Sequence, residues 1–309
     1  MIPHLDGRAE ALSALGWTGR DAEWLALVCL HSGVFLRRQY LAFIGRTNPV
    51  FAHRFVQRCG KAAVEQPWDR FRLCRIACRP LYRALGAEDV RHRRAASPAV
   101  LLRRLLSLDY VLDHLDRPWL PTEQEKVAAL TAAGVPAETL PGRVYVGRES
   151  RQRRLFVHKL PVALDRERAT FVLAQAEDAT EAAVRDWGEA HAEMWAALAA
   201  AGRAVDVVVV GRDPVRLRRA DRVLAAWTRN PRTGGAGTRT LGGQREVHAE
   251  TESIRRALAA LDHSVLETYG GLNGAAARCA ALEKEAAGFG RAKPTIATGR
   301  TWRSRRVPE

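Results

Sequence analysis

Between Phe35 and Val64 the sequence carries six lysine and arginine residues and no aspartate or glutamate. A phosphate backbone attracts cations, so an acid-free basic stretch suits a surface that meets nucleic acid. Arginine can pair with the edge of guanine, and glutamine or asparagine with adenine. The candidate DNA-binding side chains are the basic and polar ones of this stretch and of the turn after it, namely Arg37, Arg38, Arg46, Thr47, Asn48, His53, Arg54, Gln57, Arg58, Arg70 and Arg72.

Three helices are expected to position these side chains. The first covers about residues 18–33, because Thr18 suits the N-cap, Asp21 follows it by three residues and Gly33 suits the helix end. The second is short, from Leu36 to Ile44. Its arginines, at positions 37 and 38, are expected to contact phosphates.

The third helix is the one expected to lie against a groove of DNA. Asn48 suits its N-cap and Pro49 its first turn, and an apolar face with Phe51 and Phe55 continues to about Cys59. A helix with one apolar face presents its other face to solvent or to a partner. On or beside that other face the sequence places His53, Arg54, Gln57 and Arg58.

Two short strands are expected next, over residues 62–65 and 71–77, joined by a hairpin-like turn at residues 66–70. The order helix, helix, turn, helix, hairpin is that of a winged helix. Arg70 and Arg72 would then reach the DNA backbone or minor groove from the wing. The alternative is a helical hairpin with a solvated basic face, but the hairpin and the absence of acids favour DNA binding.

Residues 18–86, about a quarter of the chain, resemble the winged-helix half of replication-relaxation-type proteins and related regulators of bacterial plasmids and integrative elements. The resemblance implies DNA binding linked to mobile-element maintenance or gene control, and it supplies no catalytic residue. Such families often carry an α/β domain after the winged helix. The pieces that match are TGRDAEWLALV, LRRQYLAFIG, NPVFAHRFVQRCGKAAVEQ and RLCRIACRPLYRALG.

The second half of the chain alternates strand-like and helix-like segments. Strands are expected at 143–146, 155–162, 169–175 and 205–210, and helices at 181–200 and 214–227. Strands separated by helices predict a small α/β domain with at least one parallel strand pair. A Gly/Thr-rich loop is expected at 229–244, followed by helices at about 246–268 and 274–287. The loop lacks the Gly-Lys-Ser/Thr ending of a phosphate-binding motif.

The predicted fold is α+β, with an N-terminal winged helix-turn-helix domain at 1–90 and a basic, helical linker at 91–142. An α/β domain with C-terminal helices is expected at 143–290, and a basic, flexible tail at 291–309. The α/β domain could contact a second copy of the chain or a partner protein, and the sequence leaves both alternatives open.

A metal-dependent nuclease is the enzymatic alternative. It requires acids on adjacent strands and a nearby lysine to hold Mg²⁺ and to activate water. The candidates are Asp165, Gln175, Glu177 and Asp206, with Lys159 as the lysine of this stretch. No Glu-x-Lys element accompanies them, so we expect strand-end acids exposed to solvent, and an inactive core if a nuclease fold is present.

Composition narrows the remaining classes of protein function. A net charge of +15 favours a polyanionic partner, and the sequence has no apolar run of about 18 residues that would predict a membrane span. Five scattered cysteines predict buried free thiols rather than a zinc site. We therefore expect a cytoplasmic protein that binds double-stranded DNA, as a transcriptional regulator or a replication or transfer accessory factor. It would need no cofactor, metal or catalytic residue. A third alternative is a basic module that binds an acidic protein.

Overall fold

The computed structural model describes residues 2–5, 7–68, 71–88, 90–146, 151–156, 160–175, 180–228, 237–288 and 294–307. The chain forms two compact units, a main unit of residues 1–230 and 294–309 and a helical unit of residues 231–293. Helices and strands are mixed in the main unit, as the predicted α+β class requires. No helix in the described ranges is both long and apolar enough to span a membrane.

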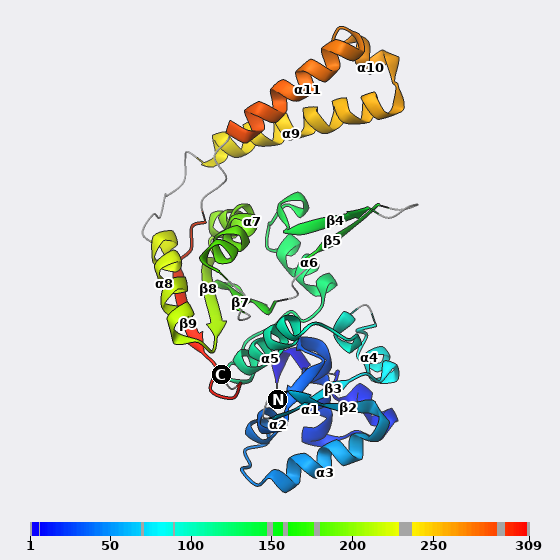
Figure 1. The fold of residues 1–309 in the computed structure, drawn as a ribbon, viewed down its shortest axis with the longest axis vertical. Helices are drawn as coiled ribbons and strands as arrows, with labels where there is room; N and C mark the ends of the chain where they lie inside the picture. Colours follow the sequence, from blue (N-terminus) through cyan, green and yellow to red (C-terminus); the bar gives the residue numbers. More distant parts are fainter. Residues whose placement is uncertain are drawn as a thin grey trace. The chain divides into compact units, whose positions relative to one another are not determined.

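The N-terminal part of the main unit contains two helical turns, η1 (Pro3–Leu5) and η2 (Glu10–Leu15), followed by helices and a small sheet (Figure 1). The sheet is antiparallel in the order β1-β3-β2, so β3 is its central strand. The elements are α1 (Gly19–His31), β1 (Val34–Leu36), α2 (Arg37–Phe43), α3 (Pro49–Cys59), β2 (Ala63–Trp68), β3 (Phe71–Ile76) and α4 (Arg79–Ala84).

Two details of this part differ from the sequence-based expectation. Thr18 makes no side-chain cap bond, and the carboxylate of Asp21, expected to complete a capping box, accepts instead from Tyr40 and Arg58. The first hairpin strand extends to Trp68, so the expected turn begins too early. Pro67 is tolerated inside this strand because β2 lies at the sheet edge, where one side of the backbone needs no ladder partner.

The turn between α1 and β1 requires a glycine. Gly33 has φ +68, and a Cβ atom built there would lie 2.5 Å from Cβ and 2.6 Å from the carbonyl oxygen of His92. Gly45, which follows α2, has a similar φ of +66, but a Cβ atom there would meet nothing within 4 Å. Both positions therefore need a left-handed backbone conformation, but only at Gly33 is there no room for a side chain.

We expect Gly33→Ala to destabilise the main unit by about 3 kcal/mol or more, because backbone atoms must move as well as adopt a strained φ. Gly45→Ala should cost only about 1–2 kcal/mol, the cost of the left-handed conformation alone. Urea unfolding of both variants, followed by tryptophan fluorescence, measures the difference. Equal losses would show that the contact with His92 does not restrict this turn.

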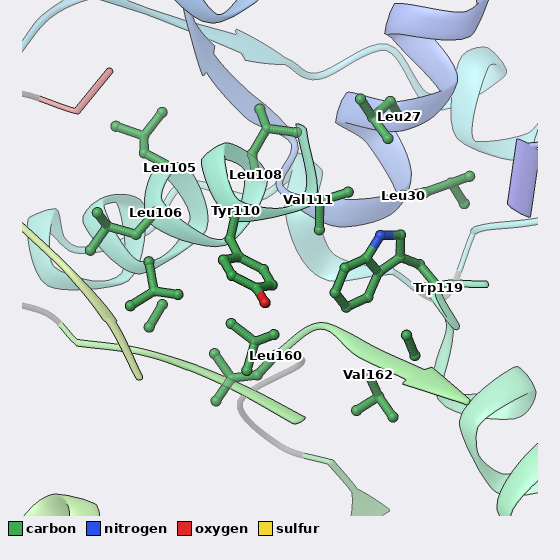
Figure 2. Close-up of a cluster of buried hydrophobic side chains, with 14 of the residues drawn as sticks. Leu27, Leu30, Leu105, Leu106, Leu108, Tyr110, Val111, Trp119, Leu160 and Val162 are labelled. Atoms are coloured by element: carbon green, nitrogen blue, oxygen red, sulfur yellow. The ribbon is translucent and has the colours of Figure 1, made fainter. Parts of the chain in front are cut away.

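Helix α5 (Pro98–Leu112) joins the N-terminal part to the rest of the main unit. It contacts α1, α2 and β1 as well as two strands of the second sheet, β7 (Arg168–Ala174) and β8 (Ala204–Gly211). Its leucines, Tyr110 and Val111 pack with Leu27 and Leu30 of α1, and with Trp119, Leu160 and Val162 (Figure 2). The expected domain boundary at residues 90 and 91 therefore does not coincide with a break in the hydrophobic core. Helix α6 (Glu123–Ala132) follows, and Thr122 and Glu125 form a capping box at its start.

The second sheet has the order β6-β7-β8-β9, with β6 antiparallel to β7 and the other neighbouring pairs parallel. The expected parallel pair is thus observed. A separate hairpin, β4 (Gly142–Val146) and β5 (Arg151–Leu155), precedes it. The elements are β6 (Val162–Leu164), β7 (Arg168–Ala174), α7 (Glu181–Ala200), β8 (Ala204–Gly211), α8 (Pro214–Thr228) and β9 (Thr298–Arg303).

Opposite faces of this sheet are covered by α5 and α8. A Cβ atom at Gly299 would meet Leu224 of α8, whereas Arg300 and Trp302 contact Tyr110 of α5. Neighbouring residues of a strand point to opposite faces. The sheet therefore lies between two helical layers, and α5 forms one of them.

The C-terminal residues do not form the flexible tail that the sequence suggests. Residues 298–303 form β9, which pairs with β8 over its full length. Beyond it, the Ser304 hydroxyl and the Arg306 side chain donate to Asp109 of α5, at 2.7 Å and 3.1 Å. The basic, Gly- and Thr-containing composition of this segment predicts mobility. Pairing with β8 instead satisfies the hydrogen-bonding groups of its backbone.

The helical unit is inserted between α8 and β9. It consists of α9 (Gly237–Ala260), α10 (His263–Glu267) and α11 (Gly271–Gly288), so the first long helix begins inside the expected Gly/Thr-rich loop. Residues 229–236 of that loop lie outside the described residues. Ile254, Ala275 and Leu282 belong to its own small core. Ion pairs join α9 and α11, from Arg255 to Glu283 at 2.7 Å and from Arg278 to Glu250 at 2.9 Å.

Candidate nucleic-acid interface

Helix α3 is anchored to the main unit along one side. Asn48 accepts a hydrogen bond from the backbone NH of Val50, and Pro49 occupies the first turn, as the sequence predicts. Ala52, Phe55 and Cys59 are buried, and the Phe55 ring stacks on Tyr40 of α2 at 4.3 Å between centroids. Burial raises the pKa of the Cys59 thiol to about 12, so the group stays a neutral core residue.

Phe51 does not join this buried side, although it was expected on the apolar face. Its side chain is 42% exposed, beside Val50 at 45%. The helix buries positions 52, 55 and 59, so position 51 falls on the flank. The Arg46 guanidinium lies 5.8 Å from the centroid of the Phe51 ring. An exposed aromatic ring therefore lies beside a cation at the N-terminal end of α3.

The exposed side of α3 brings together six of the predicted residues, which we call the α3 surface. Each of them is exposed, and no carboxylate within the described ranges forms a salt bridge with its cations. Lys61, which sequence reasoning did not single out, is exposed in the short helical turn that follows α3 and adds a cation near its C-terminal end. The surface comprises Arg46, Thr47, Asn48, His53, Arg54 and Gln57.

Arg58 is separated from this group by its contacts. Its guanidinium donates to Asp21 at 2.9 Å and to the Gly16 carbonyl at 2.8 Å, and lies 4.6 Å from the centroid of the Trp17 ring. The side chain is thus held against α1 and the turn before it. A contact to DNA through Arg58 remains a prediction, and it would have to compete with this ion pair.

Arg37 and Arg72 meet around Glu65, the first acid after the acid-free stretch. Arg37 donates to both carboxylate oxygens of Glu65 at 2.9 Å, and Arg72 lies 4.0 Å from the same group. The Arg72 side chain remains 66% exposed. Strand β2 places this carboxylate between the two arginines, and Arg72 keeps the more accessible charge.

Arg38 points toward the interior rather than into solvent. Its guanidinium lies 4.8 Å from the centroid of the Phe71 ring. Burial lowers the pKa of Arg38, while the charge of Asp109 acts in the opposite direction. The predicted phosphate contact would require the side chain to turn outward. Arg70, the other predicted wing residue, lies outside the described residues.

Those candidate nuclease residues that the structure describes, Asp165, Gln175 and Asp206, form no cation site with one another. Asp206 is 4% exposed, contrary to the expectation of an exposed acid, because β8 is an inner strand. Its carboxylate accepts from Arg168 at 2.9 Å and from Thr298 at 2.6 Å. Asp165 is exposed and accepts from backbone NH groups of its own turn. Residues 159 and 177 lie outside the described residues.

The cysteines are free thiols, and Cys29, Cys59, Cys74 and Cys279 are buried. Among the described residues no three histidine, cysteine, aspartate or glutamate side chains gather as metal ligands would. Burial is therefore found for four of the five thiols, whereas Cys78 is half-buried.

Comparison of the chain with protein-family models, with curated proteins and with solved structures finds no match.

Proposed function

We propose that this chain binds duplex DNA and that residues 1–90 act as a winged helix whose recognition helix is α3. The observation that carries the proposal is the α3 surface, an exposed basic and amide-bearing helix face with no acid among its residues. A helix of this kind fits the major groove and can contact phosphates and base edges together.

The topology supports this proposal independently of charge. A winged helix is expected to contain a helix, a short strand, two further helices and a hairpin, in that order. The described elements follow this order, and their sheet has the order β1-β3-β2. Phe55 anchors α3 from behind, so its polar side faces away from the core. In this arrangement Arg54 and Gln57 would read bases, while Arg46, Thr47, Lys61 and Arg72 would contact the backbone.

A role in transcription regulation, or in replication or transfer of a mobile element, is the biological setting that the sequence resemblance suggests. The main unit would then position the DNA-binding part rigidly, because α5 contributes to one core with both sheets. The nuclease alternative gains no support from Asp206, whose carboxylate is already hydrogen-bonded by Arg168 and Thr298.

Fluorescence anisotropy of a labelled duplex of about 25 base pairs tests DNA binding directly. We expect log K to fall linearly with log salt, with a slope of about −4 to −7 if some five to seven cations contact phosphates. Binding weaker than about 10 μM at low salt would contradict the proposal, as would a slope near zero, since even non-specific binding reaches that range.

A further inference from the structure

The main unit also contains a cavity of about 380 Å³ between α7 and the neighbouring sheet. Its apolar wall includes Val162 of β6 with Phe171 and Val172 of β7. Pro141 and Gly142 at the start of β4, Phe156 after β5, and Leu160 and Pro161 before β6 also line it. Helix α7 supplies the remaining wall through Ala183, Asp186, Trp187, Ala190 and His191. The volume suits a small organic molecule.

Aromatic rings form a large part of the lining. Trp187 and His191 lie 4.6 Å apart between ring centroids, and Phe171 lies 6.5 Å from His191. The imidazole Nδ1 donates to the carbonyl of Trp187 at 2.7 Å, which fixes the orientation of the His191 ring. The faces of aromatic rings carry partial negative charge, which attracts cations. Their large apolar surface also packs against other flat, apolar groups.

The charge of α7 favours a cation over an anion. In a chain of net charge +15, this helix carries four carboxylates and one arginine. Glu181 is engaged by Arg185 at 3.1 Å and by Arg222 at 2.8 Å. Asp186 is exposed at the cavity rim and has no salt bridge with the described residues. A carboxylate is therefore available beside the aromatic wall.

Phe156 adds a separate indication of a binding site. The backbone of this bulky residue has φ +47. The residue is only 6% exposed, and its backbone NH donates to the Pro141 carbonyl at 2.8 Å. A left-handed, β-carbon-bearing residue is strained, and such residues concentrate at ligand-binding positions. The Lys126 ammonium lies 5.9 Å from the centroid of the same ring and donates to the Leu160 carbonyl at 2.9 Å, so a bound cation is expected at the Asp186 side of the cavity, away from Lys126.

We propose that this cavity binds a small organic cation, an ammonium ion attached to an aromatic body. The ammonium group would lie at Asp186, and the aromatic body would pack against Trp187 and Phe171. This inference does not depend on DNA binding, since none of its lining residues belongs to the α3 surface.

Isothermal titration calorimetry of the full chain tests the proposal with 2-naphthylmethylammonium and its neutral analogue 2-naphthalenemethanol. We expect saturable binding of the ammonium, about tenfold or more tighter than binding of the alcohol, because both probes can donate a hydrogen bond to Asp186 but only the cation also forms an ion pair with its carboxylate. No ammonium binding up to about 1 mM would overturn the proposal, and so would equal affinities for the two probes.

Two charge variants and one cavity-filling variant locate the site. Asp186→Asn should weaken ammonium binding about tenfold and leave the alcohol unchanged. Glu193→Gln, the same charge change two turns further along α7 and outside the lining, should change neither. Ala190→Trp should abolish binding of both probes while circular dichroism stays native. Equal effects of the two charge variants, or full binding by Ala190→Trp, would overturn the assignment.

Discussion

Replacing Arg54 by glutamate is expected to weaken duplex binding by about a hundredfold or more. Arg54 lies on the exposed side of α3 and forms no salt bridge within the described residues, so its charge is available to DNA. Losing an arginine contact costs about 1–3 kcal/mol, and a carboxylate at the same place adds repulsion from phosphates. The fold should be retained, because the side chain contributes nothing to the buried side of the helix.

Arg218→Glu is the matched control for this measurement. Arg218 is an exposed arginine of α8, outside the α3 surface, and its replacement changes the net charge by the same amount. Anisotropy titrations at two salt concentrations should show less than a threefold effect for this variant. If both variants weaken binding equally, net charge rather than α3 determines the affinity. A smaller salt slope for Arg54→Glu would further assign a phosphate contact to this residue.

Replacing Asp109 by alanine is expected to destabilise the main unit by about 3–5 kcal/mol. Asp109 is fully buried in α5 and accepts from the Ser304 hydroxyl at 2.7 Å and the Arg306 guanidinium at 3.1 Å. The Gln39 amide of α2 donates to the same carboxylate at 3.4 Å. Removing this carboxylate takes away the acceptor of the buried Ser304 hydroxyl and of the Gln39 amide, and leaves Arg306 paired with Asp113 alone. The C-terminal residues and α2 would lose a shared anchor.

Asp113→Ala provides the comparison, because Asp113 binds the other side of the same guanidinium at 2.6 Å but is about one-third exposed. Its loss should cost about 1 kcal/mol or less. Tryptophan fluorescence during urea unfolding is suited to both variants, since the eight tryptophans all lie in the main unit. A similar unfolding midpoint for the two variants would contradict a special role of Asp109.

Local signals in the sequence were sufficient for several elements. Asn48 and Pro49 predicted the start of α3, because a cap acts through neighbouring backbone groups, and its apolar periodicity predicted the end near Cys59. The run of valines from 207 to 210 predicted β8 for a similar reason, since a strand buried on both faces is apolar throughout. Both kinds of signal lie within a few residues of the structure they determine.

The partners of charged side chains were not predictable in this way. Asp21 appeared to be a helix-capping residue, yet it binds Arg58, 37 positions later. Glu65 likewise binds Arg37, 28 positions earlier. An ion pair depends on which elements the fold places side by side, and composition along the chain carries no record of that. The acid-free stretch therefore identified the candidate surface but overstated how many of its cations are unpaired.

The sequence by itself determined the first three helices, the hairpin, the parallel strand pair and the basic character of α3, because caps, periodicity and charge are local properties. Only the tertiary structure decided that α5 is a core helix rather than a linker and that residues 298–303 complete the second sheet. It also decided that Trp187 and Asp186 face a cavity. These outcomes depend on pairing between segments distant in the chain, whose stabilisation comes from burial and hydrogen bonding after the chain has folded.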